Sequence, residues 1–220
     1  MLDKISPTTK PSPLQARDRF PAYLVFGAPG SGKGTQGHAL GSIPGFFHCA
    51  CGDVFRSLDV STPLGRAFLE HSSKGQLVPD ELTIALWSRQ IANHAESSTL
   101  RPETDTLVLD GIPRNVRQAQ LIDEFIDIRR VFYLECSSFD RLVERLKKRA
   151  IKDNRLDDAN DQVIQRRLEI YQQESAPLLD FYSADQIVTI DSTRPPVEVL
   201  ENILSHIIVQ TAESKHPTQK

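Results

Sequence analysis

A glycine-rich segment that directly follows a short apolar run constrains the fold of this chain more than any other feature. The apolar run covers residues 23–26 (YLVF), the segment covers residues 27–35 (GAPGSGKGT), and a helical pattern follows. The segment fits the spacing G-x-x-x-x-G-K, in which glycines let backbone N–H groups surround phosphate oxygens and the lysine neutralises them. The pattern predicts a nucleotide phosphate site formed by Gly30, Ser31, Gly32, Lys33, Gly34 and Thr35.

Short β-rich runs alternate with helical patterns along the chain. The expected strands are residues 23–27, 46–50, 106–110, 131–135 and 186–190. Near-continuous apolar strands separated by helices predict an α/β fold with a parallel sheet covered on both faces, and such sheets bind ligands at the carboxyl ends of their strands. Two regions interrupt the alternation, residues 52–97 and residues 151–160, and we expect both to be able to move relative to the sheet.

Composition and charge limit the function classes. The length of 220 residues predicts one domain, and 26 Lys and Arg against 29 Asp and Glu give a net charge of −3. This balance predicts no binding to nucleic acid or to an anionic membrane. Because no run of about 20 apolar residues and no apolar signal region occur, we expect a soluble, cytoplasmic chain. The three cysteines suggest neither a disulfide framework nor a zinc site.

Both ends of the chain are polar and lack apolar periodicity. We expect residues 1–20 to be a disordered N-terminal extension and residues 211–220 to be a C-terminal tail, which leaves residues 21–210 as the domain. A helix is expected over residues 161–182, with Pro177 kinking or breaking it.

The phosphate loop resembles that of one family in detail. The residue after Lys33 is Gly34, whereas motors and GTPases normally have Ser or Thr there, and the string GAPGSGKGTQ resembles the loop of adenylate kinases and related nucleoside monophosphate kinases. Five ordered motifs extend the resemblance over roughly residues 23–208. It implies a P-loop NTPase three-layer sandwich with a five-stranded parallel sheet, a helical insertion at residues 50–80 that binds the nucleoside monophosphate, and a short lid at residues 150–160.

Two motifs resemble the acceptor side of that family. Residues 50–56 (ACGDVFR) are similar to S-T-G-D-x-x-R, which implies that Arg56 binds the acceptor monophosphate with its planar fork of donors. Cys51 stands where typical adenylate kinases place Thr beside the acceptor base. Residues 75–80 (GQLVPD) resemble G-x-L-V-x-D, and this match implies base contacts from Gln76, Leu77 and Val78.

The motif at residues 110–114 (DGIPR) follows an apolar strand and resembles D-G-[FY]-P-R. A carboxylate at the end of a strand beside the phosphate loop is the Walker B arrangement, so Asp110 is the candidate residue for Mg²⁺, directly or through water. The resemblance implies that Gly111 and Arg114 lie where donor and acceptor phosphates meet. It also implies that Gln118 reads the acceptor base, because an amide offers a donor and an acceptor together.

The last motifs supply positive charge from outside the sheet. Residues 149–158 and 167–171 resemble the short-lid pattern R-x(n)-R-x-D-D…R-L-E-x-Y. By that resemblance Arg149 lies over the ATP base, Arg155 and Arg167 clamp the transferring phosphoryl group and the acceptor phosphate, and Asp157 and Asp158 orient these arginines. The spacing from Arg155 to Arg167 is one residue longer than in close short-lid relatives, so Arg166 competes with Arg167. Arg194 falls in a loop, residues 191–194 (DSTR), that matches the family's ATP adenine contact.

The resemblance implies a monomeric enzyme that transfers the terminal phosphoryl group of ATP to AMP, reversibly and with Mg²⁺, giving two ADP. The implied catalytic residues are Lys33, Arg114, Arg149, Arg155 and Arg167. An alternative is a UMP/CMP or broad-specificity kinase. Cys51 favours it, and so does Asn115, because the string P-R-N is typical of UMP/CMP kinases. Gln118 opposes it, because those kinases typically lack Gln at this position. Two other classes are a non-catalytic nucleotide-binding regulator, which the arginine set opposes, and a nucleic-acid-binding P-loop ATPase, which the net charge opposes.

Overall fold

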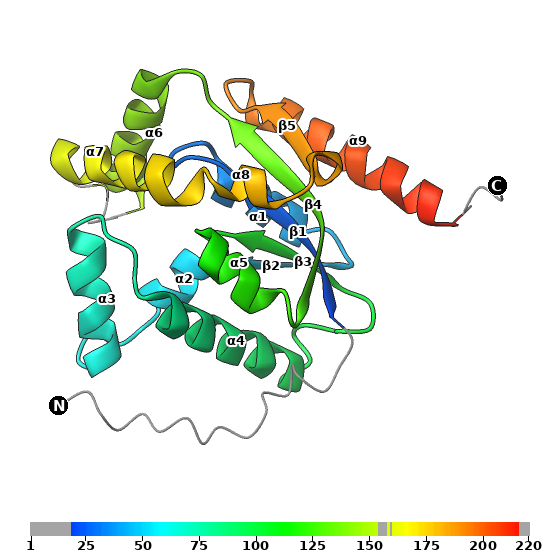
Figure 1. Ribbon diagram of the computed structural model, residues 1–220, viewed down its shortest axis with the longest axis horizontal. Coiled ribbons are helices and arrows are strands. Elements are labelled where there is room, and N and C mark those ends of the chain that lie inside the picture. Colours follow the sequence, from blue (N-terminus) through cyan, green and yellow to red (C-terminus); the bar gives the residue numbers. More distant parts are fainter. Residues whose placement is uncertain (1–18, 154–157, 159, 216–220) are drawn as a thin grey trace.

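The computed structural model describes residues 19–153, 158 and 160–215 and shows one parallel sheet with helices on both faces (Figure 1). The strand order is β2-β3-β1-β4-β5, and each neighbouring pair is parallel. The strands are β1 (Phe20–Phe26), β2 (Phe46–Ala50), β3 (Thr106–Asp110), β4 (Ile126–Glu135) and β5 (Ile187–Asp191). The predicted α/β class and five-stranded parallel sheet are therefore confirmed.

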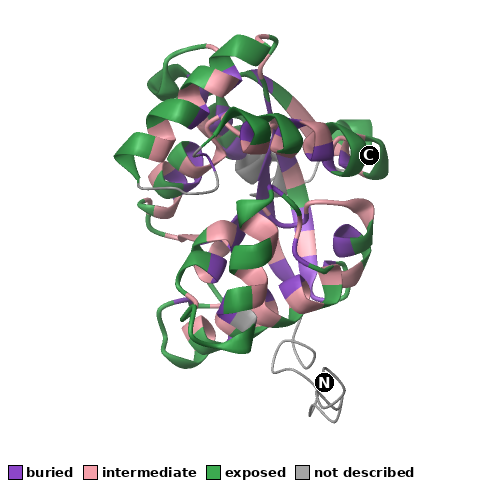
Figure 2. Ribbon diagram, turned by 90° about the vertical axis from the view of Figure 1, so that its left-hand side faces the viewer, coloured by how far each residue is buried: buried purple, intermediate pink, exposed green. Residues whose placement is uncertain are grey.

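The central strand β1 builds two hydrophobic layers because its side chains alternate between the faces of the sheet. Ala22 and Leu24 belong to a cluster shared with α4 (Asp80–Glu96), α5 (Val116–Ile122) and α8 (Leu178–Phe181). Tyr23 and Val25 belong to a second cluster shared with α1 (Lys33–Gly41) and α9 (Pro196–Lys215). Figure 2 shows the buried residues gathered along the strands and on the helix faces that cover them, as three layers require.

Two further groups of helices lie near the carboxyl edge of the sheet (Figure 1). The first contains α2 (Cys51–Arg56) and α3 (Pro63–Ser73), within the region expected to hold the acceptor. The second contains α6 (Phe139–Lys152) and α7 (Asp161–Ile170), which pack on each other through Leu142, Leu146, Ile164 and Leu168. These two helices therefore share a small hydrophobic cluster of their own, apart from the two layers that cover the sheet.

Several element ends differ from the expectations. Strand β1 begins at Phe20 and Arg19 Nε donates to the carbonyl of Ile126 at 3.0 Å, so the domain includes residues that were assigned to the N-terminal extension. The rest of that extension, residues 1–18, lies outside the described residues. At the other end α9 continues to Lys215, so residues 211–215 are helical and not a tail.

The helix expected over residues 161–182 is interrupted, as Pro177 predicted. It consists of α7, a π-helical turn (Tyr171–Ser175) and α8, with Pro177 as the residue before α8. Within the described residues, no helix is both long and apolar enough to cross a lipid bilayer.

Candidate active site

The phosphate loop joins β1 to α1 and is held in shape by its own lysine. Lys33 Nζ donates to the carbonyl oxygens of Gly27 at 2.8 Å and Ala28 at 3.0 Å. Gly32 precedes the helix with φ 101°, a left-handed conformation that glycine adopts without strain. A Cβ on Gly27 would lie 2.6 Å from the carbonyl oxygen of Leu134, so no other residue fits there. The loop therefore lies at the carboxyl edge of the central strand, with the N-terminus of α1 behind it.

Four cationic side chains converge at this loop. The pKa of Lys33 is lowered to about 8, chiefly by burial and also by the charges of Arg149, Arg114 and Arg167, whereas Asp110 acts in the opposite direction. The three arginines come from different parts of the chain: Arg114 follows β3, Arg149 is on α6 and Arg167 is on α7. Such a concentration of positive charge is unfavourable until an anion neutralises it.

The lowered pKa of Lys33 predicts that ATP binding weakens at alkaline pH. Phosphate oxygens favour the ammonium form of Lys33, so its pKa rises when ATP binds. At a pH above about 8, the pKa of Lys33 in the free protein, the amine is mostly neutral, and ATP binding must be accompanied by uptake of a proton. We expect the Kd for ATP to rise by up to about tenfold per pH unit between about pH 8 and about pH 10. Titration calorimetry in buffers of different ionisation enthalpy measures both the Kd and the proton uptake. A Kd that stays flat over this range would contradict the placement of Lys33 at the phosphates.

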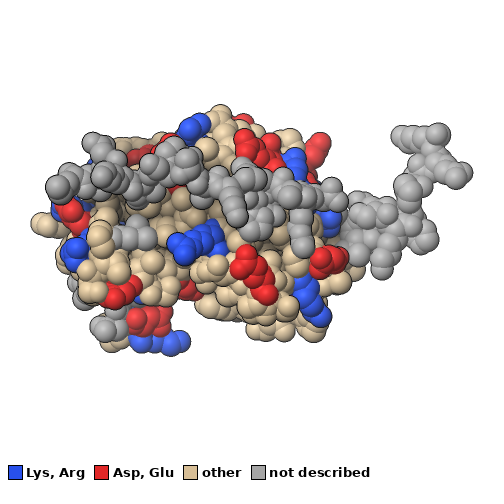
Figure 3. All heavy atoms as spheres, turned by 90° about the horizontal axis from the view of Figure 1, so that it is seen from below, with Lys and Arg blue, Asp and Glu red and all other residues tan. Residues whose placement is uncertain are grey.

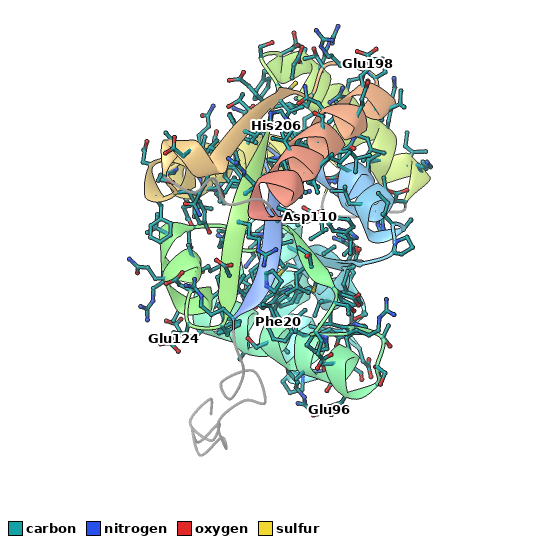
Figure 4. The ribbon with its side chains drawn as sticks, turned by 90° about the vertical axis from the view of Figure 1, so that its right-hand side faces the viewer. Phe20, Glu96, Asp110, Glu124, Glu198 and His206 are labelled. Atoms are coloured by element: carbon teal, nitrogen blue, oxygen red, sulfur yellow. The ribbon has the colours of Figure 1, made fainter. Side chains whose placement is uncertain are left out.

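Asp110 ends β3 beside the phosphate loop. It pairs in register with Val25 of β1 and Ala50 of β2, and a Cβ on Gly34 would lie 3.5 Å from its Oδ2. Figure 4 labels Asp110 near the middle of the molecule, whereas Phe20, at the opposite end of the central strands, lies lower. Among the described residues, no three His, Cys, Asp or Glu side chains form a metal cluster. One carboxylate beside a phosphate site fits Mg²⁺, which is commonly bound by one or two carboxylates, waters and substrate phosphates.

Arg56 and Cys51, which were predicted to bind the acceptor, lie on α2, which begins where β2 ends. Arg56 Nη2 forms an ion pair of 2.5 Å with Asp53 Oδ1, three residues earlier on the helix, and one third of the Arg56 side chain is exposed. Cys51 is buried, and burial raises the pKa of its thiol to about 11. The thiol is thus protonated at neutral pH and offers the acceptor only a weak hydrogen-bond donor.

Gly75, the residue before Gln76, Leu77 and Val78, lies against α7. A Cβ on Gly75 would lie 3.1 Å from Arg167 Cγ and 3.1 Å from the carbonyl oxygen of Val163. The predicted base contacts therefore lie close to a predicted phosphate ligand, although more than 80 residues separate them in the sequence.

Asp158 joins two of the converging arginines. Its carboxylate is fully buried, accepts a hydrogen bond from Arg149 Nε at 2.8 Å, lies 2.6 Å from Arg149 Nη2 as an ion pair, and also pairs with Arg167 Nη1. Arg166, the competing candidate, has a half-exposed side chain and pairs with Glu169 at 3.5 Å. The geometry therefore favours Arg167 over Arg166. Arg155 and Asp157 lie outside the described residues.

The residue beside the expected ATP adenine loop is Arg145, which the sequence analysis did not single out. Arg145 Nη2 donates to the carbonyl oxygen of Ser192 at 2.8 Å. Arg194 belongs to the same loop, and its exposed side chain pairs with Glu198 at 3.3 Å. Arg149 was expected over the base, but it lies at Asp158 and close to Lys33, one helical turn after Arg145 on α6. The spacing of four residues puts both arginines on one face of the helix, and this could have indicated Arg145.

Most of these groups line one cleft of about 830 Å³. Its walls include the phosphate loop, Asp110 and the 75–78 segment. The basic residues on its walls are Lys33, Arg56, Arg114, Arg145, Lys148, Arg149, Lys152, Arg167 and Arg194. Elsewhere, on the face in Figure 3, positive and negative side chains are interspersed. Positively charged side chains thus outnumber negatively charged ones on the walls of the cleft, although the net charge of the chain is negative.

A phosphate loop after the central strand of a parallel sheet, a carboxylate ending the neighbouring strand and arginines from outside the sheet define a P-loop phosphotransferase. Comparison with known proteins narrows this class. The family model described as adenylate kinase matches residues 25–187. The chain belongs to the adenylate kinase family, whose members are nucleoside monophosphate kinases.

Three similar relatives are named adenylate kinase. One from Cyanothece sp. is 37% identical and the match covers 87% of this chain and 97% of the relative. One from Clostridium novyi is 33% identical over 84% of this chain and 97% of the relative. One from Chlamydia muridarum is 32% identical over 85% of this chain and 87% of the relative.

Proposed function

We propose that this chain transfers the terminal phosphoryl group of ATP to AMP, reversibly and with Mg²⁺, giving two ADP. The observation that carries this proposal is the convergence of Lys33, Arg114, Arg149 and Arg167 on a single cleft that the acceptor segments also line. Membership of the adenylate kinase family supports AMP as the acceptor. A regulator that only binds nucleotide would have no need of cations on both the donor and the acceptor side.

ATP binds with its phosphates on the loop and its base near α6. The loop N–H groups and the Lys33 ammonium hold the phosphate oxygens, with Gly30 to Thr35 forming the cradle. Arg145 and Arg194 flank the base, since Arg145 is anchored on the carbonyl of Ser192 and both side chains line the cleft. Arg149 acts on the phosphates, where Asp158 orients its guanidinium.

AMP binds on the opposite wall of the cleft. Arg56 and Arg114 hold its phosphate, with Gly111 beside them and Arg114 Nε anchored on the Gly111 carbonyl at 3.0 Å. The base lies among Cys51, the 76–78 segment and Gln118. Cys51 contributes packing more than hydrogen bonding, so the amide of Gln118 determines which base is accepted.

Transfer itself needs positioning and charge compensation more than covalent chemistry. Lys33, Arg149 and Arg167 neutralise the charge that spreads over the transferring group, and Arg114 links it to the acceptor. Asp110 would hold Mg²⁺, which would supply further neutralisation of charge on the phosphate oxygens. No residue acts as a nucleophile. Closure of residues 150–160 over ATP and of residues 50–80 over AMP excludes water, with Arg155 and Asp157 belonging to the first segment.

The catalytic unit is the domain expected over residues 21–210, with the acceptor-binding insertion at 50–80 and the short lid at 150–160. We propose that it acts as a monomer, because the described residues of a single chain line both the donor and the acceptor side of the cleft. We place it in the cytoplasm, a compartment that suits its three free cysteines, none of them in a disulfide.

An acceptor panel tests this function. With Mg²⁺ and ATP, product formation is measured for AMP, GMP, CMP, UMP and dTMP in turn, with Lys33→Ala as the blank. We expect AMP to have the highest kcat/KM. A preference for UMP would refute AMP as the cognate acceptor, and an absence of transfer to every acceptor would refute a kinase altogether.

A further inference from the structure

The amide of Gln118 is held at both of its polar atoms by other residues of the chain. Its Nε2 donates to Asp80 Oδ1 at 2.8 Å, and its Oε1 accepts from the backbone N–H of Arg114 at 2.8 Å. Gln118 is only 1% exposed, yet it lines the cleft. Its side chain is therefore fixed before any nucleotide binds.

The partners of this amide determine its orientation without ambiguity. A carboxylate only accepts hydrogen bonds and a backbone N–H only donates them, so Nε2 must face Asp80 and Oε1 must face Arg114. If the amide were turned over, Oε1 would lie against the carboxylate and Nε2 against an N–H group. Both contacts would then be repulsive in a buried place, where unpaired polar atoms are costly.

Asp80 is the centre of this arrangement because it also fixes Asn115. Asn115 Nδ2 donates to both carboxylate oxygens of Asp80 at 3.1 Å, and Asn115 Oδ1 accepts from the backbone N–H of Gln118 at 2.8 Å. The first residue of α4 thus holds the side chain of Gln118 directly and the start of α5 through Asn115. Asn115, which in the sequence favoured a UMP/CMP kinase, has a structural task here.

We propose that Asp80 is a positioning residue that, through Gln118, makes the acceptor site select bases with an amino group beside an unprotonated ring nitrogen. Gln118 has one N–H and one acceptor position left over. The acceptor position takes the amino N–H of the base, and the remaining N–H donates to the ring nitrogen. Adenine and cytosine present this edge. Hypoxanthine, guanine and uracil present a carbonyl and a ring N–H, which oppose the fixed amide at both atoms. The inference rests on the proposed kinase function.

Two pairs of acceptors test this in the unmodified protein. AMP and IMP differ only at the edge in question, and CMP and UMP form the corresponding pyrimidine pair. We expect kcat/KM to be about 100-fold higher for AMP than for IMP and about tenfold higher for CMP than for UMP. A wild-type enzyme that uses AMP well but accepts IMP equally, or prefers UMP to CMP, would overturn the role of the fixed amide. No transfer from ATP to AMP would instead refute the proposed function.

Asp80→Ala tests the positioning role, with Glu81→Ala as the matched control. Glu81 is the next residue of the same first turn, is 73% exposed and pairs with Arg117 at 3.6 Å. In Asp80→Ala the AMP/IMP ratio should fall about tenfold, through a higher KM for AMP, while kcat with saturating AMP and the KM for ATP stay near wild type. Glu81→Ala should keep the wild-type ratio. An unchanged ratio in an active Asp80→Ala protein would overturn the proposal, and if this variant does not fold, the wild-type acceptor pairs decide.

Discussion

Lys33→Ala lowers kcat by about 10³-fold or more while the fold is retained. The expectation follows from the position of the ammonium group, which bridges the carbonyls of Gly27 and Ala28 inside the loop and faces the other cations. A preorganised charge at the transferring phosphoryl group is worth several kcal/mol in the transition state, and alanine removes it entirely. The variant loses the two carbonyl hydrogen bonds of Lys33 but also removes a buried ammonium that lies near three arginines, so its melting temperature should change little. Steady-state kinetics and thermal unfolding together check both parts.

The control for this variant is Lys74→Ala. Lys74 is also a lysine, but it is 57% exposed and pairs with Glu70 on its own helix at 3.0 Å, an interaction of little energetic value. We expect its kcat to stay within about twofold of wild type. If Lys33→Ala kept a tenth or more of the wild-type kcat, the phosphate loop would not be the centre of the chemistry.

The sequence was sufficient where local pattern determines structure. Strands β2 and β3 have the predicted bounds, because both are short, mostly apolar runs. Strand β4 was expected only from Val131, but it begins at Ile126, because Ile126 and Ile128 alternate with polar residues and do not form a continuous apolar run. The predicted residues of the phosphate loop are adjacent in the sequence, so their spacing alone defined a site.

The sequence was insufficient where the site depends on how helices pack. Arg145 and Arg149 are one helical turn apart on α6, but Arg145 contacts the adenine loop at Ser192 and Arg149 contacts Asp158. Which of the two arginines meets which neighbour depends on the direction in which α6 leaves the sheet. The network of Asp80 and Gln118 joins α4 to α5, and no periodicity or motif spacing encodes a contact between side chains 38 residues apart. Such contacts follow from tertiary packing and become visible only in three dimensions.

We expect the second large effect from replacing Arg167, and the separate replacement of its neighbour Arg166 provides the comparison. Arg167→Ala should lower kcat by about 100-fold or more, because this guanidinium reaches the charge cluster around Lys33 and is oriented there by Asp158. Arg166→Ala should leave kcat within about twofold of wild type, since an exposed pair with Glu169 contributes little. The two variants remove the same charge from consecutive positions of α7, so net charge and helix propensity cannot account for a difference between them. Initial rates at saturating ATP and AMP measure it.

A lysine at position 167 separates charge from geometry at the same site. Arg167→Lys keeps the positive charge but loses the planar fork that lets one guanidinium contact Asp158 and a phosphate oxygen together. If orientation by Asp158 matters, Arg167→Lys should recover less than about a tenth of the activity lost in Arg167→Ala. Full recovery would mean that the cluster works through net charge alone, and equal activities of Arg166→Ala and Arg167→Ala would show that α7 presents a different face to the phosphates. The buried carboxylate of Asp158 between two arginines argues against both outcomes, because a cluster that needed only net charge would gain nothing from a fixed geometry.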